Sequence, residues 1–289
     1  MPTLRDIKRR IISVKNTRQI TKAMKMVAAA KLRKAQAKMF EARPYAEKMK
    51  SVITDLARGS ERELHPLLAF RPRKTVEVIV MTGDRGLCSA FNSNILRAAI
   101  GFISNLKREG FEVSISAIGK KGRDYFKRRA IPLRKSWTGL SGRIVYTSAQ
   151  EVANEIIENY INETIDEVFL IYNEFKSILT QKVSIMKLLP IDLETETEGK
   201  VVSGSDFLYE PSEQEILNRL LPKNVEIQIF RALLESQASE EAARMTAMEN
   251  ATKNATEMTD RLTLQYNKAR QAAITRELMD IVGGAEALK

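Results

Sequence analysis

The stretch IKRRIISVKNTRQITKAMKMVAAAKLRKAQ, residues 7–36, decides the fold of this chain. Apolar residues recur in it at alternating spacings of three and four, and the pattern extends from residue 4 to residue 56. The seam positions are Leu4, Ile7, Ile11, Val14, Arg18, Thr21, Lys25, Ala28, Leu32, Ala35, Met39, Ala42, Ala46, Met49, Ile53 and Leu56. A heptad pattern kept over so many turns predicts a coiled-coil helix.

The seam has a polar interruption where Arg18, Thr21 and Lys25 occupy seam positions. Apolar neighbours flank this interruption, and we expect the seam to shift sideways onto them. They are Ile20, Met24 and Val27. Further along, we expect Pro44 to bend the helix without ending it, because the heptad pattern continues past the proline.

A second heptad pattern runs toward the end of the chain. Its positions are Met248, Ala251, Ala255, Met258, Leu262, Gln265, Ala269, Ala272, Arg276 and Met279. No proline follows Pro222, so we expect one helix over about residues 213–285, about 110 Å long at 1.5 Å per residue. A helix over residues 3–57 would measure about 80 Å. The two helices are expected to pair antiparallel, and the second helix must then overhang the first.

Strand and helix patterns alternate between the two long helices. Runs rich in β-branched residues predict strands at Thr75–Thr82, Phe111–Ile118 and Glu167–Tyr172, and helical stretches separate them near 91–109, 119–129 and 147–163. A fourth run, Gln181–Leu189, lies close enough to the third strand to form a hairpin with it. The order of elements predicts a small α/β domain with a largely parallel sheet.

These patterns divide the chain into four expected parts. They are an N-terminal coiled-coil helix over residues 1–57, a central Rossmann-like α/β domain over 74–190, an acidic connecting loop over 191–212 and a C-terminal coiled-coil helix over 213–289. We therefore expect a fold that combines an α/β domain with a long antiparallel coiled coil. Helices of this length exceed what their own chain can cover, which implies docking inside another protein.

The net charge of +11 is concentrated in the first helix. Residues 1–57 contain fifteen Lys or Arg against four acids, while Asp192–Glu215 carries eight carboxylates and one lysine. A basic helix could bind a nucleic acid, so a nucleic-acid-binding coiled-coil protein stays open as the alternative. Acidic protein surfaces are favoured as partners, because the basic residues alternate with seam positions and no aromatics are interleaved for base stacking.

Residues that could carry chemistry are scarce. Cys88 is the single cysteine and His65 the single histidine, so we expect no metal site and no catalytic triad. His65 is expected to be a solvated loop residue. We expect no cofactor and no enzymatic activity of the chain by itself. The chain contains no apolar stretch long enough to span a membrane and no signal-peptide pattern at Met1, which favours a cytoplasmic compartment.

The segment MTGDRGLCSAFN, Met81–Asn92, follows a predicted strand and opens a predicted helix. An α/β domain binds phosphate at such a position. The segment has only Gly83 and Gly86, however, and matches no phosphate-binding motif. A structural turn is favoured over a ligand site. A nucleotide-dependent enzyme is therefore less favoured than a protein that docks into another protein or one that binds nucleic acid.

Four segments resemble the gamma subunit of F-type ATP synthases, and the resemblance covers nearly the whole chain. They are residues 7–36, TGDRGLC at residues 82–88, ASEEAARMTAMENATKN at 238–254 and YNKARQAAITRELMDIVGGAEAL at 266–288. The resemblance implies a rotating central stalk whose coiled coil enters a ring of alpha and beta subunits. It also implies an α/β foot that contacts the epsilon subunit and the c-ring, on the cytoplasmic face of a bacterial membrane.

The resemblance also implies roles for particular residues. Met24 and Lys25 match a region that contacts a beta subunit, and positions along the last helix match coupling contacts with beta. The latter are Arg244, Arg270, Gln271, Thr275 and Glu277. Glu210 matches a position near the epsilon and c-ring contact.

The chain departs from the family pattern after Leu87, because Cys88 is followed by Ser89 and Ala90 where the family often has two glycines. It also lacks the cysteine-bearing insertion of the chloroplast form. We therefore expect no thiol regulation.

Overall fold

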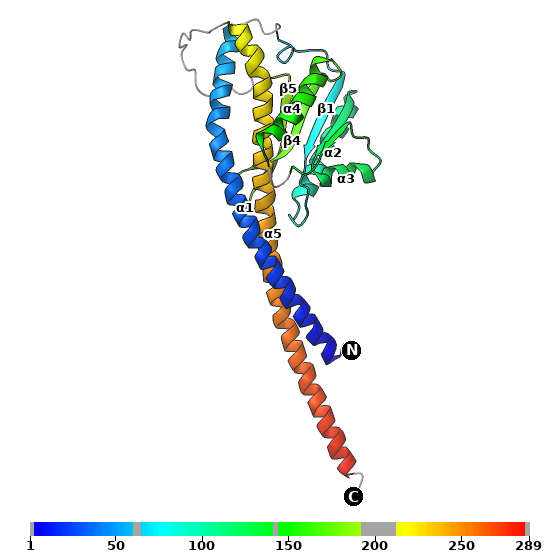
Figure 1. Cartoon of the computed structure of the whole chain (residues 1–289). Helices are drawn as coiled ribbons and strands as arrows, with labels where there is room; N and C mark the ends of the chain where they lie inside the picture. The colour runs from blue at the N-terminus through cyan, green and yellow to red at the C-terminus, as the bar shows by residue number, and fades with distance from the viewer. Residues whose placement is uncertain (1–2, 60–64, 141–143, 192–211, 287–289) are drawn as a thin grey trace. The chain divides into compact units, whose positions relative to one another are not determined.

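The structure is a computed structural model that describes residues 3–59, 65–140, 144–191 and 212–286 (Figure 1). Its elements are α1 Leu4–Gly59, β1 Thr75–Met81, α2 Phe91–Arg108, β2 Glu112–Ile118, α3 Lys120–Arg128, β3 Lys135–Trp137, α4 Tyr146–Ile161, β4 Glu167–Phe175, β5 Gln181–Leu189 and α5 Glu213–Glu286. They form two compact units, which are considered separately. The coil unit comprises Met1–Ala28 and Arg244–Lys289, and the α/β unit comprises Ala29–Ala243.

Both long helices form as single elements, α1 with 56 residues and α5 with 74. Pro44 lies inside α1 and Pro222 inside α5, so neither proline ends its helix. The expected fold class, an α/β domain combined with two long helices, is confirmed. The compact units divide the chain within α1 and α5, whereas the predicted domain boundaries follow the ends of elements, and those boundaries stay a prediction.

In the coil unit, α1 and α5 pair in antiparallel orientation. Thr252 Oγ1 donates to Thr21 Oγ1 at 2.8 Å, and Lys25 Nζ lies 2.6 Å from Glu249 Oε1. Residue numbers therefore rise along α1 while they fall along the facing stretch of α5. This is the arrangement that the two heptad patterns predicted.

The predicted sideways shift of the seam is wrong. Ile20 and Val27 are 60% and 56% exposed, while Thr21 is 8% exposed and stays in the seam. The Thr21 hydroxyl accepts from Thr252 across the seam and donates to the Arg18 carbonyl at 3.1 Å, so the polar interruption needs no apolar replacement. Small side chains at this point also allow the two helices to approach closely.

The buried seam of α5 does not extend past the start of α1 at Leu4. Met248, Ala255 and Thr259 are buried, and residues 274–283 are all exposed. The predicted seam residue Met279, beyond this point, is 66% exposed. Met258 is 51% exposed although it lies between the buried Ala255 and Thr259, so its predicted seam position is wrong. Heptad spacing in the sequence therefore continues beyond the part of α5 that has a helical partner within the coil unit, as the predicted overhang requires.

The α/β unit contains one sheet with strand order β3-β2-β1-β4-β5. β1 pairs in parallel with β2 and β4, β3 pairs in parallel with β2, and β5 pairs antiparallel with β4. The largely parallel sheet and its hairpin are confirmed. The three-residue strand β3 was missed because it is too short to show an alternating pattern.

Helices cover both faces of this sheet. Val76, Val78 and Val80 point into a core with α2 and α3, and Ile79 and Met81 point into a second core with α4, α1 and α5. Alternate residues of β1 thus fill two cores, which explains why the strand is apolar except for Thr75 at its start and Glu77. Glu77 is fully buried and accepts two bonds from Arg134.

Candidate functional site

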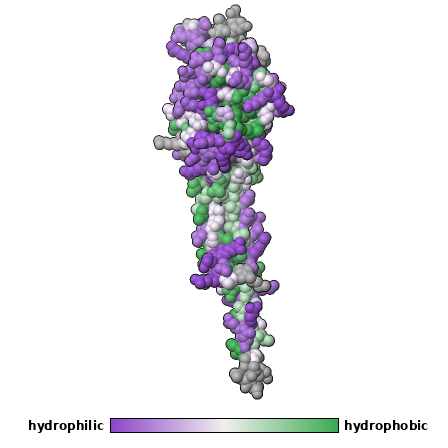
Figure 2. Space-filling view, turned by 90° about the vertical axis from the view of Figure 1, so that its right-hand side faces the viewer, coloured by the Kyte–Doolittle hydropathy of each residue, from purple (hydrophilic) through white to green (hydrophobic). Residues whose placement is uncertain are grey.

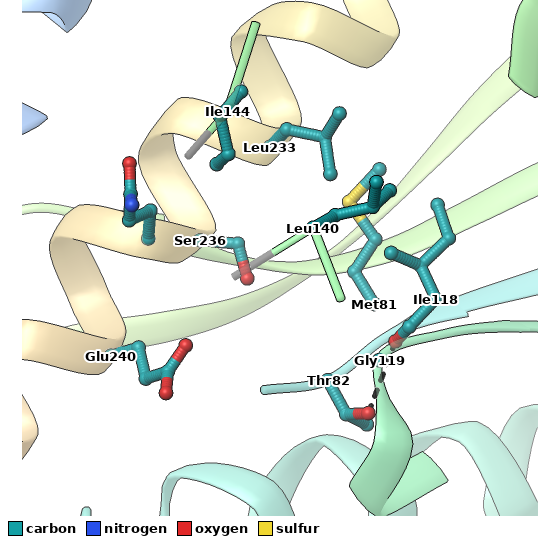
Figure 3. Close-up of a pocket in the computed structure, with 10 residues that line it drawn as sticks. Met81, Thr82, Ile118, Gly119, Leu140, Ile144, Leu233, Ser236 and Glu240 are labelled. Carbon is teal, nitrogen blue, oxygen red and sulfur yellow. Dashed lines mark hydrogen bonds between the residues drawn. The ribbon is translucent and has the colours of Figure 1, made fainter. Parts of the chain in front are cut away.

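The carboxyl ends of the parallel strands are where an α/β sheet usually binds a ligand. In this chain α5 covers that edge, as Figure 3 shows for Leu233, Ser236 and Glu240 opposite Met81 and Thr82. The space left between them is about 20 Å³, which has room for a single water molecule. The crevice is therefore filled by the chain itself and offers no room for a nucleotide.

Gly83 allows the end of the Glu240 side chain to pack closely against this turn. A Cβ atom at Gly83 would lie 2.7 Å from the carboxyl carbon of Glu240, whereas one at Gly86 would lie 3.8 Å from Lys121 Cε. The first distance is a clash, and the second is an ordinary contact. The favoured prediction of a structural turn agrees with this geometry.

Hydrogen bonds of Gly83 connect the Met81–Asn92 turn to the starts of α2 and α3. The Gly83 N–H donates to Asn92 Oδ1 at 2.9 Å, and the Gly83 carbonyl accepts from the Lys121 N–H at 3.1 Å. Ser89 has a φ of 50°, in the left-handed region, at the first of the two positions where the family often has glycine. This turn therefore forms without those glycines, although Ser89 adopts a conformation that costs free energy.

His65 is half-buried, so the prediction of a solvated loop residue is wrong. Its Nδ1 accepts a hydrogen bond from the Leu67 N–H at 3.1 Å, and burial lowers the pKa of its imidazole. The neutral ring thus closes a turn that leads into the buried residues Leu67 and Leu68. No sequence pattern indicated this local bond.

The coil unit exposes many large apolar side chains. On α1 they are Ile12, Ile20, Met26 and Val27, and on α5 they are Met258, Leu264, Ile274, Leu278, Met279, Ile281 and Val282, each more than half exposed. Figure 2 shows apolar surface interspersed with hydrophilic surface along the two helices. Apolar surface on this scale is characteristic of a protein interface.

A groove of about 770 Å³ crosses the helix pair of the coil unit. Four cationic side chains line it, from Arg18, Lys22, Lys25 and Lys253, against the single carboxylate of Glu249. Only Lys25 forms an ion pair with that carboxylate among the described residues. The groove therefore presents excess positive charge that suits an acidic protein surface.

The structure places the predicted coupling residues in different environments. Met24 and Lys25 are half-buried on α1, near the polar seam contacts. Four residues beyond the seam of α5 are exposed, namely Arg270, Gln271, Thr275 and Glu277. Arg244 is only 8% exposed, so its side chain is largely covered by the chain itself. Glu210 and most of the acidic loop lie outside the described residues.

The described residues contain neither a metal-binding cluster nor a membrane-spanning helix. Within 3–59, 65–140, 144–191 and 212–286, no group of His, Cys, Asp or Glu side chains could hold a metal ion. No helix in these ranges is both long and apolar enough to cross a bilayer.

An exposed apolar and basic coiled coil, together with an α/β unit whose strand-edge crevice is filled, defines a subunit that acts by docking into other proteins. A family model described as ATP synthase matches residues 3–288. The chain belongs to the ATP synthase gamma chain family, which provides the non-catalytic central stalk of the rotary ATP synthase.

Relatives from bacteria match over the full length of the chain. The ATP synthase gamma chain of Anaeromyxobacter sp. (strain K) is 52% identical over 292 residues, and that of Geobacter metallireducens is 50% identical over 289 residues. In both comparisons all of this chain and all of the relative are covered. None of these relatives supports the nucleic-acid-binding alternative.

Solved structures of ATP synthase rotors resemble the fold. The central stalk and c-ring structure of the Tetrahymena thermophila mitochondrial enzyme contains a chain with 28% identity and a TM-score of 0.59, covering 80% of this chain and 99% of that one. A chain of the Euglena gracilis mitochondrial rotor has 22% identity and a TM-score of 0.63, covering 94% and 98%. The second likeness concerns the fold alone.

Proposed function

We propose that the coil unit turns inside a ring of alpha and beta subunits, and that the α/β unit contacts the epsilon subunit and the c-ring. The observation that carries this proposal is the exposed end of α5. Leu264 and Ile281 are each 71% exposed, and residues 274–283 are all exposed. Exposed apolar side chains gathered on this scale mark a protein–protein interaction site.

The rotor transmits free energy because it is asymmetric. Its basic groove, with Arg18, Lys22 and Lys253 on one side of the helix pair, differs from the rest of the surface. Each orientation of the stalk then stabilises a different conformation of the beta subunit that it faces. Ion flow that turns the stalk changes the affinity of each beta subunit for nucleotide, and ATP hydrolysis drives the reverse rotation.

The proposed beta contacts fall into two groups. Lys25 lines the basic groove and Met24 precedes it on α1, and an acidic loop of beta would find complementary charge in this groove. Arg270, Gln271, Thr275 and Glu277 are exposed on the overhanging part of α5, where their polar groups would bond beta directly. Arg244 and Glu210 are proposed on the family resemblance alone.

The proposed location follows from these partners. The c-ring lies in the membrane, so a stalk bound to it is a peripheral membrane protein on the cytoplasmic face of a bacterial cell membrane. The acidic residues of the connecting loop, Glu210 among them, are proposed to face epsilon or the c-ring.

Reconstitution tests the proposal. The chain is mixed with alpha and beta subunits, and ATP hydrolysis is measured for the chain alone and for the complex. We expect no hydrolysis by the chain alone and hydrolysis by the complex that depends on the chain. Hydrolysis by the chain itself, or an alpha and beta complex indifferent to the chain, would refute the stalk function.

A variant with Arg270→Ala and Gln271→Ala tests the residue assignment in the fully assembled enzyme, with ATP-driven ion transport per ATP hydrolysed as the measurement. We expect lower transport per ATP. Arg276→Ala is the matched control, because Arg276 is also exposed and lies six residues from Arg270 and five from Gln271, which places it on another face of α5. Equal loss in both variants would remove the special role of residues 270 and 271.

A further inference from the structure

A second basic groove lies in the α/β unit, on the sheet face that α2 and α3 cover. Its volume is about 460 Å³, within the range of small-molecule sites in proteins. It starts at the amino end of α2, which follows the carboxyl end of β1, and continues between the two helices. Because α5 fills the crevice on the other side of this edge, the groove is a separate site that the stalk function leaves without a role.

Three cations gather in this groove without a salt bridge among the described residues, although Asp124, whose carbonyl accepts from Arg128 Nε at 3.1 Å, lies near one of them. Arg97, Lys121 and Arg128 line it, all three are exposed, and none forms an ion pair among the described residues. The nearby carboxylate of Asp124 is engaged by Arg123 at 2.9 Å instead. Three positive charges that converge on one groove repel each other, and a bound anion would relieve that repulsion.

The groove also has an apolar floor and further donors. Leu96 is 6% exposed, and Ile100 and Tyr125 are half-buried. Asn92 and Ser93, which line the same groove, belong to the first turn of α2, where the helix has no side-chain cap and amide groups lack an intrahelical acceptor. Cations, amide donors and an apolar floor together suit a ligand that has both an anionic and a flat apolar part.

We propose that the groove between α2 and α3 binds a phosphate-bearing small molecule. The two guanidinium groups, of Arg97 and Arg128, can each form paired hydrogen bonds to the oxygens of a phosphate. A single carboxylate of a protein partner has only two oxygens and would leave some of these donors unpaired.

An acidic helix is the competing occupant. One helical turn is about 10–12 Å across and 5.4 Å long, so the groove would hold about one turn and leave little contact for stable docking.

The test uses isothermal titration calorimetry on the full chain, with pyrophosphate and ATP as separate probes. The groove variant carries Arg97→Gln and Arg128→Gln. The control carries Lys107→Gln and Arg108→Gln, which remove the same charge from the last turn of α2, away from the groove. We expect the groove variant to bind at least tenfold more weakly than the original chain, and the control to bind within twofold of it.

The two probes distinguish the source of the phosphate. Tighter binding of ATP than of pyrophosphate would support a nucleotide whose base contacts Leu96 and Tyr125, and equal binding would support an inorganic polyphosphate. Equal weakening in the groove variant and the control would show a general charge effect and overturn the site. Absence of binding by both probes would also overturn it, as would tighter binding of a poly-glutamate peptide than of either probe.

Discussion

The α/β unit and the coil unit differ in how they satisfy their apolar residues. In the α/β unit, Ile79, Ile156 and Leu170 are fully buried, and helices cover both faces of the sheet. In the coil unit, Leu264 and Ile281 are each 71% exposed. The first unit buries its apolar residues within the chain. The second leaves its apolar residues exposed, as expected for a surface that other proteins cover. The apolar pattern of the coil unit is therefore explained by an assembly and not by the isolated chain.

Charged residues show the same contrast. The carboxylate of Glu77 is fully buried and accepts two bonds from Arg134, at 2.7 and 2.8 Å. Lys25 and Glu249 of the coil unit are 39% and 55% exposed at their side chains. Breaking a buried pair leaves an uncompensated charge, while an exposed pair exchanges its partner for water.

The largest effect is expected from the buried ion pair. Arg134→Met leaves Glu77 charged and buried, and we expect the free energy of unfolding to fall by about 3–5 kcal/mol. The matched change in the coil unit, Lys25→Met, should cost about 0.2–1 kcal/mol. Chemical denaturation monitored by circular dichroism measures both.

A second substitution keeps this test informative if Arg134→Met does not fold. Glu77→Gln removes the buried charge, so the double variant with Arg134→Met should recover part of the loss. Equal costs at Arg134 and Lys25 would contradict the contrast between the two units.

The next effect concerns apolar packing. Ile156 is fully buried, and Ile156→Ala should lower the free energy of unfolding by about 2–5 kcal/mol because it leaves a cavity. Leu264→Ala should change the stability of the isolated chain by less than about 0.5 kcal/mol, yet weaken its binding to alpha and beta subunits. A large loss of stability from Leu264→Ala would show that the exposed end of α5 is covered within the chain.

A smaller effect is expected where α5 fills the strand-edge crevice. Gly83→Ala places a methyl group 2.7 Å from the Glu240 carboxyl carbon. The end of this buried side chain must then shift, and we expect a cost of about 1 kcal/mol, the low end of overpacking costs. Gly86→Ala is the control, because its added methyl group meets only the end of Lys121 at 3.8 Å. If both variants unfold at the same denaturant concentration, α5 does not seal the crevice as described.

Local sequence patterns predicted most of the helices and strands. They did not predict contacts between residues that are far apart in the sequence. Heptad spacing identified both long helices and β-branched runs identified β1, β2, β4 and β5, because each signal is repeated along the chain. The pairing of Thr21 with Thr252 was missed, since no pattern joins residues so far apart. The filled crevice was missed for the same reason, because it depends on Glu240 reaching the turn at Gly83.

Of the candidate interaction surfaces, one was predicted from the sequence and one was not. The exposed end of α5 followed from its length, since a longer helix must overhang a shorter antiparallel partner. The basic groove between α2 and α3 did not follow from the sequence. Arg97 belongs to one helix and Lys121 and Arg128 to another, and only the right-handed connections between parallel strands bring these helices together on one face of the sheet.

The smallest effect is expected from His65, the single histidine of the chain. Its pKa is lowered by burial, and its Nδ1 must be unprotonated to accept the Leu67 N–H. The unfolded chain therefore binds a proton more readily than the folded chain. The stability contributed by His65 should be fully present above the ordinary histidine pKa of about 6.5, and it should decline as the pH falls from that value through the lowered pKa of the folded chain.

His65→Asn isolates this contribution, because an amide oxygen can still accept the Leu67 N–H but does not titrate. Between about pH 7.5 and pH 5.5 histidine titrates, whereas carboxylates and lysines with ordinary pKa values do not. We expect the free energy of unfolding of the original chain to decrease more over this range than that of the variant. Identical pH profiles for the two proteins would mean that the imidazole of His65 is as well solvated in the folded chain as in the unfolded one. A steeper decline of stability in the original chain would show that the imidazole of His65 is desolvated when the α/β unit folds.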